Sequence, residues 1–304
     1  MILVTGITGK SGTWFLKRLI REKEDLKNTK FRVVVRNTSN VELIDRSGLS
    51  IEKVYGDLHD ASFAEEAMEN VSTVLHIAGI HTSLNVVKAA IKHDVNRLIL
   101  VHTTGIYSKY KSASFQYIET ERRIEEMTAN RNIDVTILRP TMIYGSISDN
   151  NVIVFIKMVD KLKLFPVINH ARYPLQPVHE KDLGEAYYQV LFNPEKTRNK
   201  NYNLSGKEPI LLIDMLKTIG FYLGKKNVFI SIPFPVAYVG ALFLYGVTAG
   251  KIDFRERVQR MVEPRTFSHD EASRDFGYSP VGFKEGITKE IDEYVTKKYK
   301  KTTR

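Results

Sequence analysis

Three glycines near the start of the chain constrain its fold more than any other feature. Gly6, Gly9 and Gly12 lie between an apolar run at residues 1–4 and a segment at 13–20 whose apolar residues recur at helical spacing. The order is therefore strand, glycine turn and helix. Such a turn exposes the N–H groups of the helix start, where the helix dipole adds about half a positive charge. The sequence predicts an anion site here, because missing Cβ atoms let a pyrophosphate approach the backbone.

Two kinds of phosphate-binding loop fit a strand, turn and helix, and the glycine spacing separates them. Gly9, Lys10 and Ser11 match the end of a P-loop, but that motif needs a further glycine at the position of Val4. The glycines are instead spaced G-x-x-G-x-x-G, one residue wider at the front than the usual dinucleotide fingerprint. We therefore expect a dinucleotide, with its diphosphate held by Gly6, Thr8, Gly9, Lys10, Ser11 and Gly12.

Strands and helices alternate through the first half of the chain. Apolar runs predict strands at 31–36, 51–55, 71–79, 98–101 and 135–145, and helices are predicted at 63–68, 84–92 and 115–129. The run at 98–101 is nearly all apolar, which is typical of a parallel strand buried on both faces. The sequence therefore predicts an α/β fold with a Rossmann-like, doubly wound parallel sheet.

The alternation weakens after residue 165, where prolines become frequent. We expect residues 1–165 to form a dinucleotide-binding domain, to which part of 175–204 returns. Residues 166–304 are expected to form a smaller, interleaved substrate-binding lobe. This lobe should cover the carboxyl edge of the sheet, where open α/β sheets bind their ligands.

Arg36 ends the second predicted strand. At this place in dinucleotide-binding folds an acidic residue accepts a hydrogen bond from the ribose 2′-OH, whereas a basic residue accommodates a 2′-phosphate. Arg36, with Lys10 near it in the same fold, therefore favours NADP over NAD as the cofactor.

Composition and net charge restrict the ligands and the cellular compartment that we expect for this chain. The 304 residues include no cysteine, so disulfide and thiolate chemistry are excluded and nothing points to an oxidising compartment. The formal net charge of +10 favours phosphorylated ligands, polyanions or an acidic membrane surface. No signal peptide precedes the first strand, so we expect a cytoplasmic protein. We expect a small-molecule substrate, no nucleic acid and no metal site, and we consider a homodimer.

The stretch 228–250 carries no charge, which raises the question of a membrane span. Pro233 and Pro235 interrupt it, and the remaining 236–247 would form a helix of about 18 Å, short of a hydrocarbon core of about 30 Å. We therefore predict no span and expect a buried helix of the second lobe. The alternatives are that it forms an apolar wall of the substrate site or makes a shallow, peripheral contact with a membrane.

Together these pieces resemble the short-chain dehydrogenase/reductase superfamily, in its extended or atypical branch of NAD(P)-dependent epimerase and dehydratase relatives. The matching segments run almost end to end, at residues 5–12, 56–58, 76–79, 102–107, 138–145, 177–182 and 202–206. The resemblance implies that Asp57 and Leu58 border the adenine and that Ala78 and Gly79 pass beneath a ribose. It also implies that the nicotinamide is held by Pro140, Thr141, Met142 and Ile143.

The resemblance further implies catalytic residues, with one departure. Thr103 stands where the family has the Ser or Thr that polarises the reacting carbonyl, and Tyr117 suits the catalytic tyrosine. Glu121 replaces the family's lysine one helical turn later, and a like charge opposes ionisation of a phenol whose pKa is ordinarily about 10. Alternative proton carriers are His81, or Glu121 itself if burial raises its pKa.

Two further departures bear on the chemistry. Tyr107 and Lys111 repeat the tyrosine-to-lysine interval, but in a predicted loop, where a spacing of four has no helical meaning. Nucleotide-sugar relatives usually carry an arginine before the segment that ends at Asp182, and here Leu175 and Gln176 occupy that neighbourhood, with Arg172 out of register.

Two functions follow from the sequence. The first is an NADP-binding oxidoreductase of the epimerase/dehydratase or reductase type, acting on a carbonyl or alcohol of a small molecule, with nucleotide sugars as one candidate class. The alternative is a non-catalytic NADP sensor that has kept the fold and lost the lysine.

Overall fold

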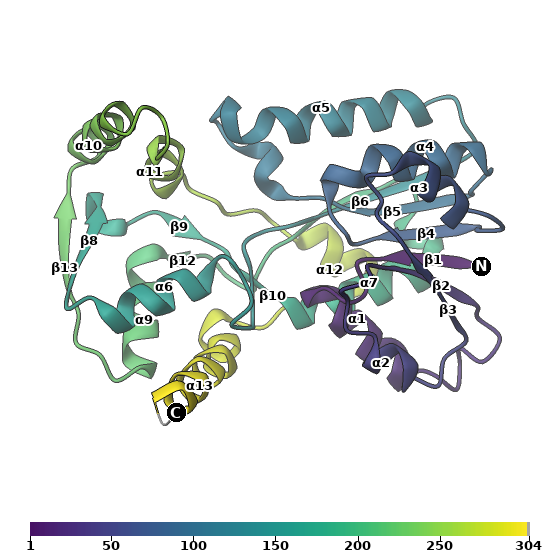
Figure 1. The fold of residues 1–304 in the computed structure, drawn as a ribbon, viewed down its shortest axis with the longest axis horizontal. Helices are drawn as coiled ribbons and strands as arrows, with labels where there is room; N and C mark the ends of the chain where they lie inside the picture. Colours follow the sequence, from purple (N-terminus) through teal and green to yellow (C-terminus); the bar gives the residue numbers. More distant parts are fainter. Residues whose placement is uncertain (303–304) are drawn as a thin grey trace.

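The computed structural model describes residues 1–302, apart from the side chains of 111–113 and 300–302. Its core is a seven-stranded, all-parallel sheet with the strand order β11-β6-β5-β4-β1-β2-β3 (Figure 1). The strands are β1 (Ile2–Thr5), β2 (Phe31–Val35), β3 (Ile51–Tyr55), β4 (Thr73–His76), β5 (Arg97–Val101), β6 (Asp134–Pro140) and β11 (Asn201–Leu204). The chain reverses direction across the sheet between β1 and β4, which confirms the predicted doubly wound, Rossmann-like α/β fold.

Helices cover both faces of this sheet. One face packs against α1 (Lys10–Arg21), α2 (Glu42–Asp45), α7 (Glu180–Phe192) and α12 (Asp270–Phe276). The other face packs against α3 (Ala61–Ala67), α4 (Ser83–Lys92) and α5 (Lys111–Thr128). Each helix buries one apolar stripe, such as Phe15, Leu16 and Leu19 of α1, as an amphipathic sequence requires.

A second lobe lies beyond the carboxyl edge of the sheet (Figure 1). Its core contains α6 (Val152–Lys161), α9 (Leu212–Tyr222) and α13 (Phe283–Thr302). Short strand pairs join these helices: β7 (Ile143–Tyr144) with β10 (Val178–His179), β8 (Leu164–Ile168) with β13 (Val228–Ile232), and β9 (Pro174–Leu175) with β12 (Ile210–Leu211). The remaining elements are η1 (Ile80–Thr82), η2 (Thr104–Tyr107), η3 (Asn169–Ala171), α8 (Pro194–Thr197), α10 (Phe234–Val247) and α11 (Arg255–Met261).

The chain passes between the two parts more than once. After the first crossing, α7 returns to pack against α1, and β11 adds the last strand beside β6. A side-chain hydrogen bond joins the two helices, since Trp14 Nε1 on α1 donates to Glu180 Oε1 on α7 at 3.0 Å. The sheet edge, the start of α7 and the second lobe therefore meet in one region.

The uncharged stretch 228–250 does not form the buried helix that we expected. It forms β13 and then α10, and Ala241 is the one buried residue among the fourteen of α10. The prediction was wrong because an apolar composition alone does not determine whether other parts of the same chain cover a helix. Here α10 packs chiefly against α11, which itself buries no residue. Among the described residues, no helix has the length and apolar character needed to cross a bilayer.

Candidate functional site

A cavity of about 500 Å³ lies at the carboxyl edge of the sheet, around the turn between β1 and α1. The loops after β2, β3 and β4 and the segment before α6 complete its wall. Ten of its lining residues are predicted cofactor contacts: Gly6, Thr8, Gly9, Lys10, Ser11, Arg36, Asp57, Leu58, Ala78 and Ile143. Ser39, His59, Thr82, Asn150 and Asn151 also line it, and no sequence motif indicated them.

The glycine turn has the close approach that a diphosphate site needs. Gly6 has a φ of +71°, and a Cβ there would lie 2.7 Å from the backbone nitrogen of Ala78. A Cβ on Gly12 would lie 2.1 Å from the carbonyl oxygen of Gly6, so this glycine lets α1 pack against the turn and does not itself line the cavity. Gly9 is the N-cap of α1, whose first N–H groups have no acceptor within the helix. The turn fits an anion at the helix start.

The end of the cavity beside β2 and β3 is rich in polar groups. Arg36 lines it, and its backbone N–H donates to Ser39 Oγ at 3.2 Å. Thr8 Oγ1 donates to the same hydroxyl at 3.4 Å. Asp57 accepts from the backbone and ring nitrogens of His59 at 2.9 and 2.8 Å, and these bonds lower its pKa. This end therefore presents a guanidinium, two hydroxyls and an ionised carboxylate.

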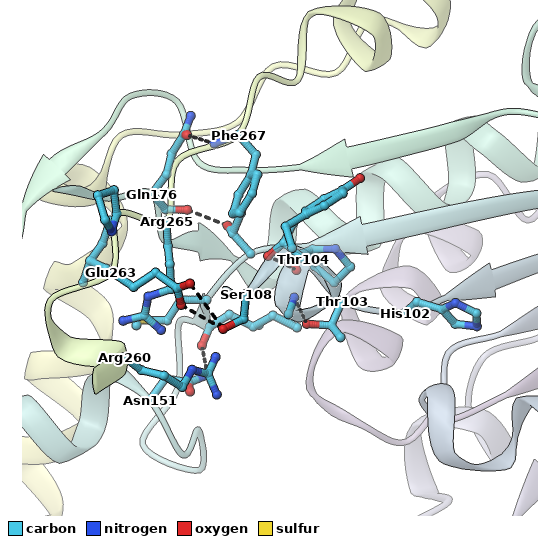
Figure 2. A pocket seen from close by; sticks show the side chains of 18 residues that line it. His102, Thr103, Thr104, Ser108, Asn151, Gln176, Arg260, Glu263, Arg265 and Phe267 are labelled. Carbon is cyan, nitrogen blue, oxygen red and sulfur yellow. Dashed lines mark hydrogen bonds between the residues drawn. The ribbon is translucent and has the colours of Figure 1, made fainter. Parts of the chain in front are cut away.

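A second cavity, of about 300 Å³, adjoins the first, because Ile143 and Asn151 line both. Figure 2 shows its walls, with Thr103 on one side and residues of the second lobe on the other. The four predicted nicotinamide contacts all line it: Pro140, Thr141, Met142 and Ile143. A ligand long enough to fill the first cavity would thus extend toward Thr103.

Thr103 and Tyr117 both lie close to Gly105. Thr103 Oγ1 accepts from the Gly105 backbone N–H at 3.0 Å, and its side chain lines the second cavity. A Cβ on Gly105 would lie 3.0 Å from the ring of Tyr117 and 3.3 Å from Thr103 Oγ1. The ring of His81 is exposed, with its centroid 6.0 Å from that of Tyr117. The structure therefore brings these three predicted residues together, although Tyr117 and His81 do not line the cavity.

Glu121 does not have the surroundings that we expected. It is buried, and Arg139 Nε and His102 Nδ1 each donate to its Oε1 at 3.0 Å. Burial alone raises the pKa of Glu121, but the bonds from His102 and Arg139 outweigh it, so the pKa is lowered. The raised pKa, on which the alternative of Glu121 as a general base depended, is therefore not found. The carboxylate is instead neutralised by a cation, so it is not an isolated charge opposing the tyrosine.

Sequence reasoning missed Arg139 and His102 as partners, although both lie in segments that carry the family resemblance. A signal was present: Arg139 interrupts an apolar strand, and a buried cation needs a compensating anion. What the sequence did not show was which carboxylate supplies it.

The second tyrosine and lysine pair is only half described. Tyr107 lines the second cavity, and its hydroxyl donates to Asn203 Oδ1 at 3.3 Å and accepts from Arg139 Nη1 at 3.4 Å. The side chain of Lys111 lies outside the described part of the chain.

Two arginines enter the second cavity from the side opposite Thr103 (Figure 2). Arg260 belongs to α11 and Arg265 to the loop that follows, and the Nε atom of each is buried without a hydrogen-bond partner. Burial lowers the pKa of Arg265 to about 10, so it remains a cation at neutral pH. Glu263 lies between them in sequence. Its carboxylate accepts hydrogen bonds from Ser108 Oγ at 3.0 Å and from the Lys109 N–H at 2.7 Å.

Arg260 and Arg265 line the same cavity as Leu175 and Gln176, the two residues that stand where nucleotide-sugar relatives usually carry an arginine. Arg172 is not among the lining residues. No motif pointed to Arg260 or Arg265, because they follow an unrelated apolar helix far along the chain.

Comparisons with known proteins agree with this architecture. Residues 6–160 match the model of a family described as NAD(P)H-binding. The UDP-glucose 4-epimerase of Thermotoga maritima, solved with UDP-glucose, has a TM-score of 0.71 at 17% identity, covering 97% of this chain and 99% of that one. The dTDP-glucose 4,6-dehydratase DesIV of Streptomyces venezuelae, solved with NAD, has a TM-score of 0.72 at 16% identity, covering 98% of each chain. At these identities the likeness shows the fold.

One curated protein shares a shorter stretch with this chain. Sterol demethylase protein B of Methylococcus capsulatus is 37% identical over 76 residues, which are 25% of this chain. The match spans about a fifth of that protein, 21% of its length.

Proposed function

The chain belongs to an NAD(P)H-binding family and has the fold of the extended short-chain dehydrogenases/reductases, and from this premise we propose that it is an NADP-dependent oxidoreductase. We place it with the epimerase/dehydratase or reductase type, acting on a carbonyl or alcohol of an anionic small molecule. The observation that carries this proposal is the second cavity, which adjoins the predicted cofactor cavity and combines Thr103 with two arginines whose Nε atoms are buried without a hydrogen-bond partner.

The residues of the chain have distinct parts in such a reaction. The nicotinamide, when bound, supplies or accepts the hydride. Thr103 would donate a hydrogen bond to the oxygen of the reacting carbonyl, and Tyr117 would exchange a proton with that oxygen. The pair of Glu121 and Arg139 would fix α5 against β6, which holds Tyr117 in position.

The arginines support an anionic substrate. Both arginines line the cavity, and each keeps a buried Nε–H without a partner, so each has unused donor capacity there. A guanidinium pairs well with phosphate and carboxylate. A nucleotide sugar carries a diphosphate and fits this requirement. The names of the two structural neighbours, a UDP-glucose epimerase and a dTDP-glucose dehydratase, favour the same class.

Replacement of both proposed catalytic groups tests the reaction. We expect Thr103→Val and Tyr117→Phe each to lower turnover by about a hundredfold or more, as loss of a positioned proton donor does, while NADP affinity stays unchanged. Turnover is followed by NADPH absorbance for a net reduction or oxidation, and by chromatography of the product for an epimerase or dehydratase, which regenerates its cofactor. The substrates are UDP- and dTDP-sugars and, after the curated relative, a sterol. Unchanged turnover in both variants would show that these roles are wrong.

Arg36 gives a test of the choice between NADP and NAD. We expect Arg36→Ala to weaken NADP binding about tenfold or more, because a charge-assisted hydrogen bond to the 2′-phosphate contributes about 1.5–3 kcal/mol. NAD binding should change little, since NAD lacks this group. Calorimetric titration of both nucleotides measures the effect. Arg46→Ala is the control, because Arg46 is exposed and pairs with Glu42 outside the cofactor cavity; equal losses for both nucleotides would refute the assignment.

A non-catalytic NADP sensor is the second candidate, and the glutamate at position 121 is what favours it. The ion pair with Arg139 weakens that argument, because it removes the uncompensated charge. Thermal unfolding separates the two functions, since a ligand that binds only the folded chain raises its stability. An enzyme should be stabilised further by an anionic substrate added to the NADP complex, whereas a sensor should respond to NADP alone.

A further inference from the structure

The outer side of α10 is an exposed apolar surface. Five side chains form it, and we call them the α10 face: Val236, Val239, Leu242, Phe243 and Val247. They are 61, 63, 47, 70 and 62% exposed. The whole stretch 228–250 carries no charge, so no polar side of the helix faces water instead. Scattered apolar residues are ordinary on a protein surface, but a contiguous group of this kind marks an interaction site.

The helix is apolar all round, a composition found in protein cores and in membranes. Within the described structure it packs chiefly against α11, and Figure 1 shows both helices at the top of the second lobe, with α10 on the outer side of α11. With fourteen residues α10 is about 21 Å long, which is too short to span a bilayer but sufficient to lie in its surface.

Cations follow α10 in the chain. They are Lys251 and Arg257, together with Arg255 and Arg260, which pair with Asp253 and Glu256. The Arg255 guanidinium lies 3.8 Å from the centre of the Tyr245 ring, which holds it against α10. An apolar helix with aromatic rings, followed by a cluster of basic residues, has the composition of segments that bind an anionic membrane surface.

The charge also argues against a second copy of this chain as the occupant. A two-fold interface uses the same patch on both sides, so it would bring the basic cluster after α10 in one copy toward that of the other. Like charges at such a rim oppose association, whereas anionic headgroups complement it. We propose that the α10 face docks on an anionic lipid bilayer. Because α10 leads into α11, this docking would bring Arg260 and the second cavity close to the membrane surface.

Vesicle flotation of the full chain tests this inference, independently of any activity. We expect the wild type to float with vesicles of phosphatidylcholine and phosphatidylserine, less with phosphatidylcholine alone, and less as salt is raised. Phe243→Ser should reduce the bound fraction about tenfold or more, because a phenyl group no longer leaves water. Phe221→Ser is the matched control, since Phe221 is 79% exposed on α9, at the opposite side of the lobe from α10 in Figure 1.

Charge and oligomeric state complete the experiment. The double variant Lys251→Glu and Arg257→Glu should lose the preference for phosphatidylserine. NADP titration of each variant shows that it is folded and leaves the proposed function as a separate question. The inference is overturned if the wild type remains unbound at low salt, or if Phe243→Ser floats like the wild type. It is also overturned if Phe243→Ser turns a dimer into a monomer in light scattering without changing vesicle binding.

Discussion

We expect Glu121→Ala to lower the free energy of unfolding by about 3–5 kcal/mol, because removing one partner of a buried ion pair leaves the other charge buried and unpaired. The side chains of Glu121 and Arg139 are only 9 and 10% exposed. His102, fully buried at its side chain, loses the acceptor for its Nδ1–H at the same time. Urea denaturation at neutral pH, followed by circular dichroism, measures the change.

Glu119→Ala is the matched control for this prediction, because Glu119 lies on the same helix and also forms ion pairs. Its partners are Arg122 and Arg123, each at 2.7 Å, and their side chains are 51 and 56% exposed. Exposed pairs of this kind contribute about 0–1 kcal/mol. Similar losses in the two variants would contradict the view that Arg139 depends on Glu121.

The same pair changes the meaning of a lysine at position 121. A lysine there would place a second cation beside Arg139, in a region where burial already penalises charge. Restoring the family's lysine is therefore a fair test of the tyrosine only when Arg139 is replaced as well. The glutamate and the arginine are one feature of this chain, contributed by α5 and β6.

Much of the fold could be predicted because its strands are short, apolar and separated by recognisable helices. The strand at 51–55 has the bounds of β3, and the strand at 98–101 differs from β5 by one residue. Helix starts were less accurate: α1 begins at Lys10, directly after its cap at Gly9, three residues before the first apolar residues that indicated it. Periodicity reports the buried side of a helix, and a first turn without buried apolar residues does not contribute to it.

The cavity proposed for the cofactor was more predictable than the one proposed for the substrate, for a physical reason. Its predicted residues lie in loops that directly follow strands of one parallel sheet, and such loops necessarily meet at one edge. Arg260 and Arg265 reach the second cavity from beyond α10, through a path of chain that no period or motif specifies. The exposure of α10 was hidden for a related reason, because apolar composition does not reveal whether protein or another phase covers it.

A buried acidic pair lies next to the cofactor cavity. Glu290 on α13 is fully buried and Asp149, before α6, is 3% exposed. Glu290 Oε2 accepts from the Gly145 N–H at 3.0 Å, but its Oε1 and the Oδ2 of Asp149 are buried with no partner. A proton on Glu290 would satisfy both oxygens. Burial, followed by the neighbouring Asp149, raises the pKa of Glu290 far above its ordinary value, so Glu290 is protonated in the folded chain at neutral pH.

This protonation predicts that stability falls with rising pH. Above the ordinary glutamate pKa of about 4.3 the unfolded chain has lost a proton that the folded chain keeps, and each pH unit then costs the folded state about 1.4 kcal/mol. Glu290→Gln keeps an acceptor for the Gly145 N–H and offers Asp149 an amide N–H donor. Because the amide does not titrate, the variant should not show this slope. We expect the unfolding free energy of the variant, relative to the wild type, to grow by about 3 kcal/mol between pH 6 and pH 8.

Urea denaturation at each pH measures this difference. Glu293→Gln is the control, since Glu293 is exposed on the same helix and accepts from the Ile147 N–H at 3.3 Å. Parallel pH curves for the wild type and Glu290→Gln would mean that Glu290 is ionised in the folded chain.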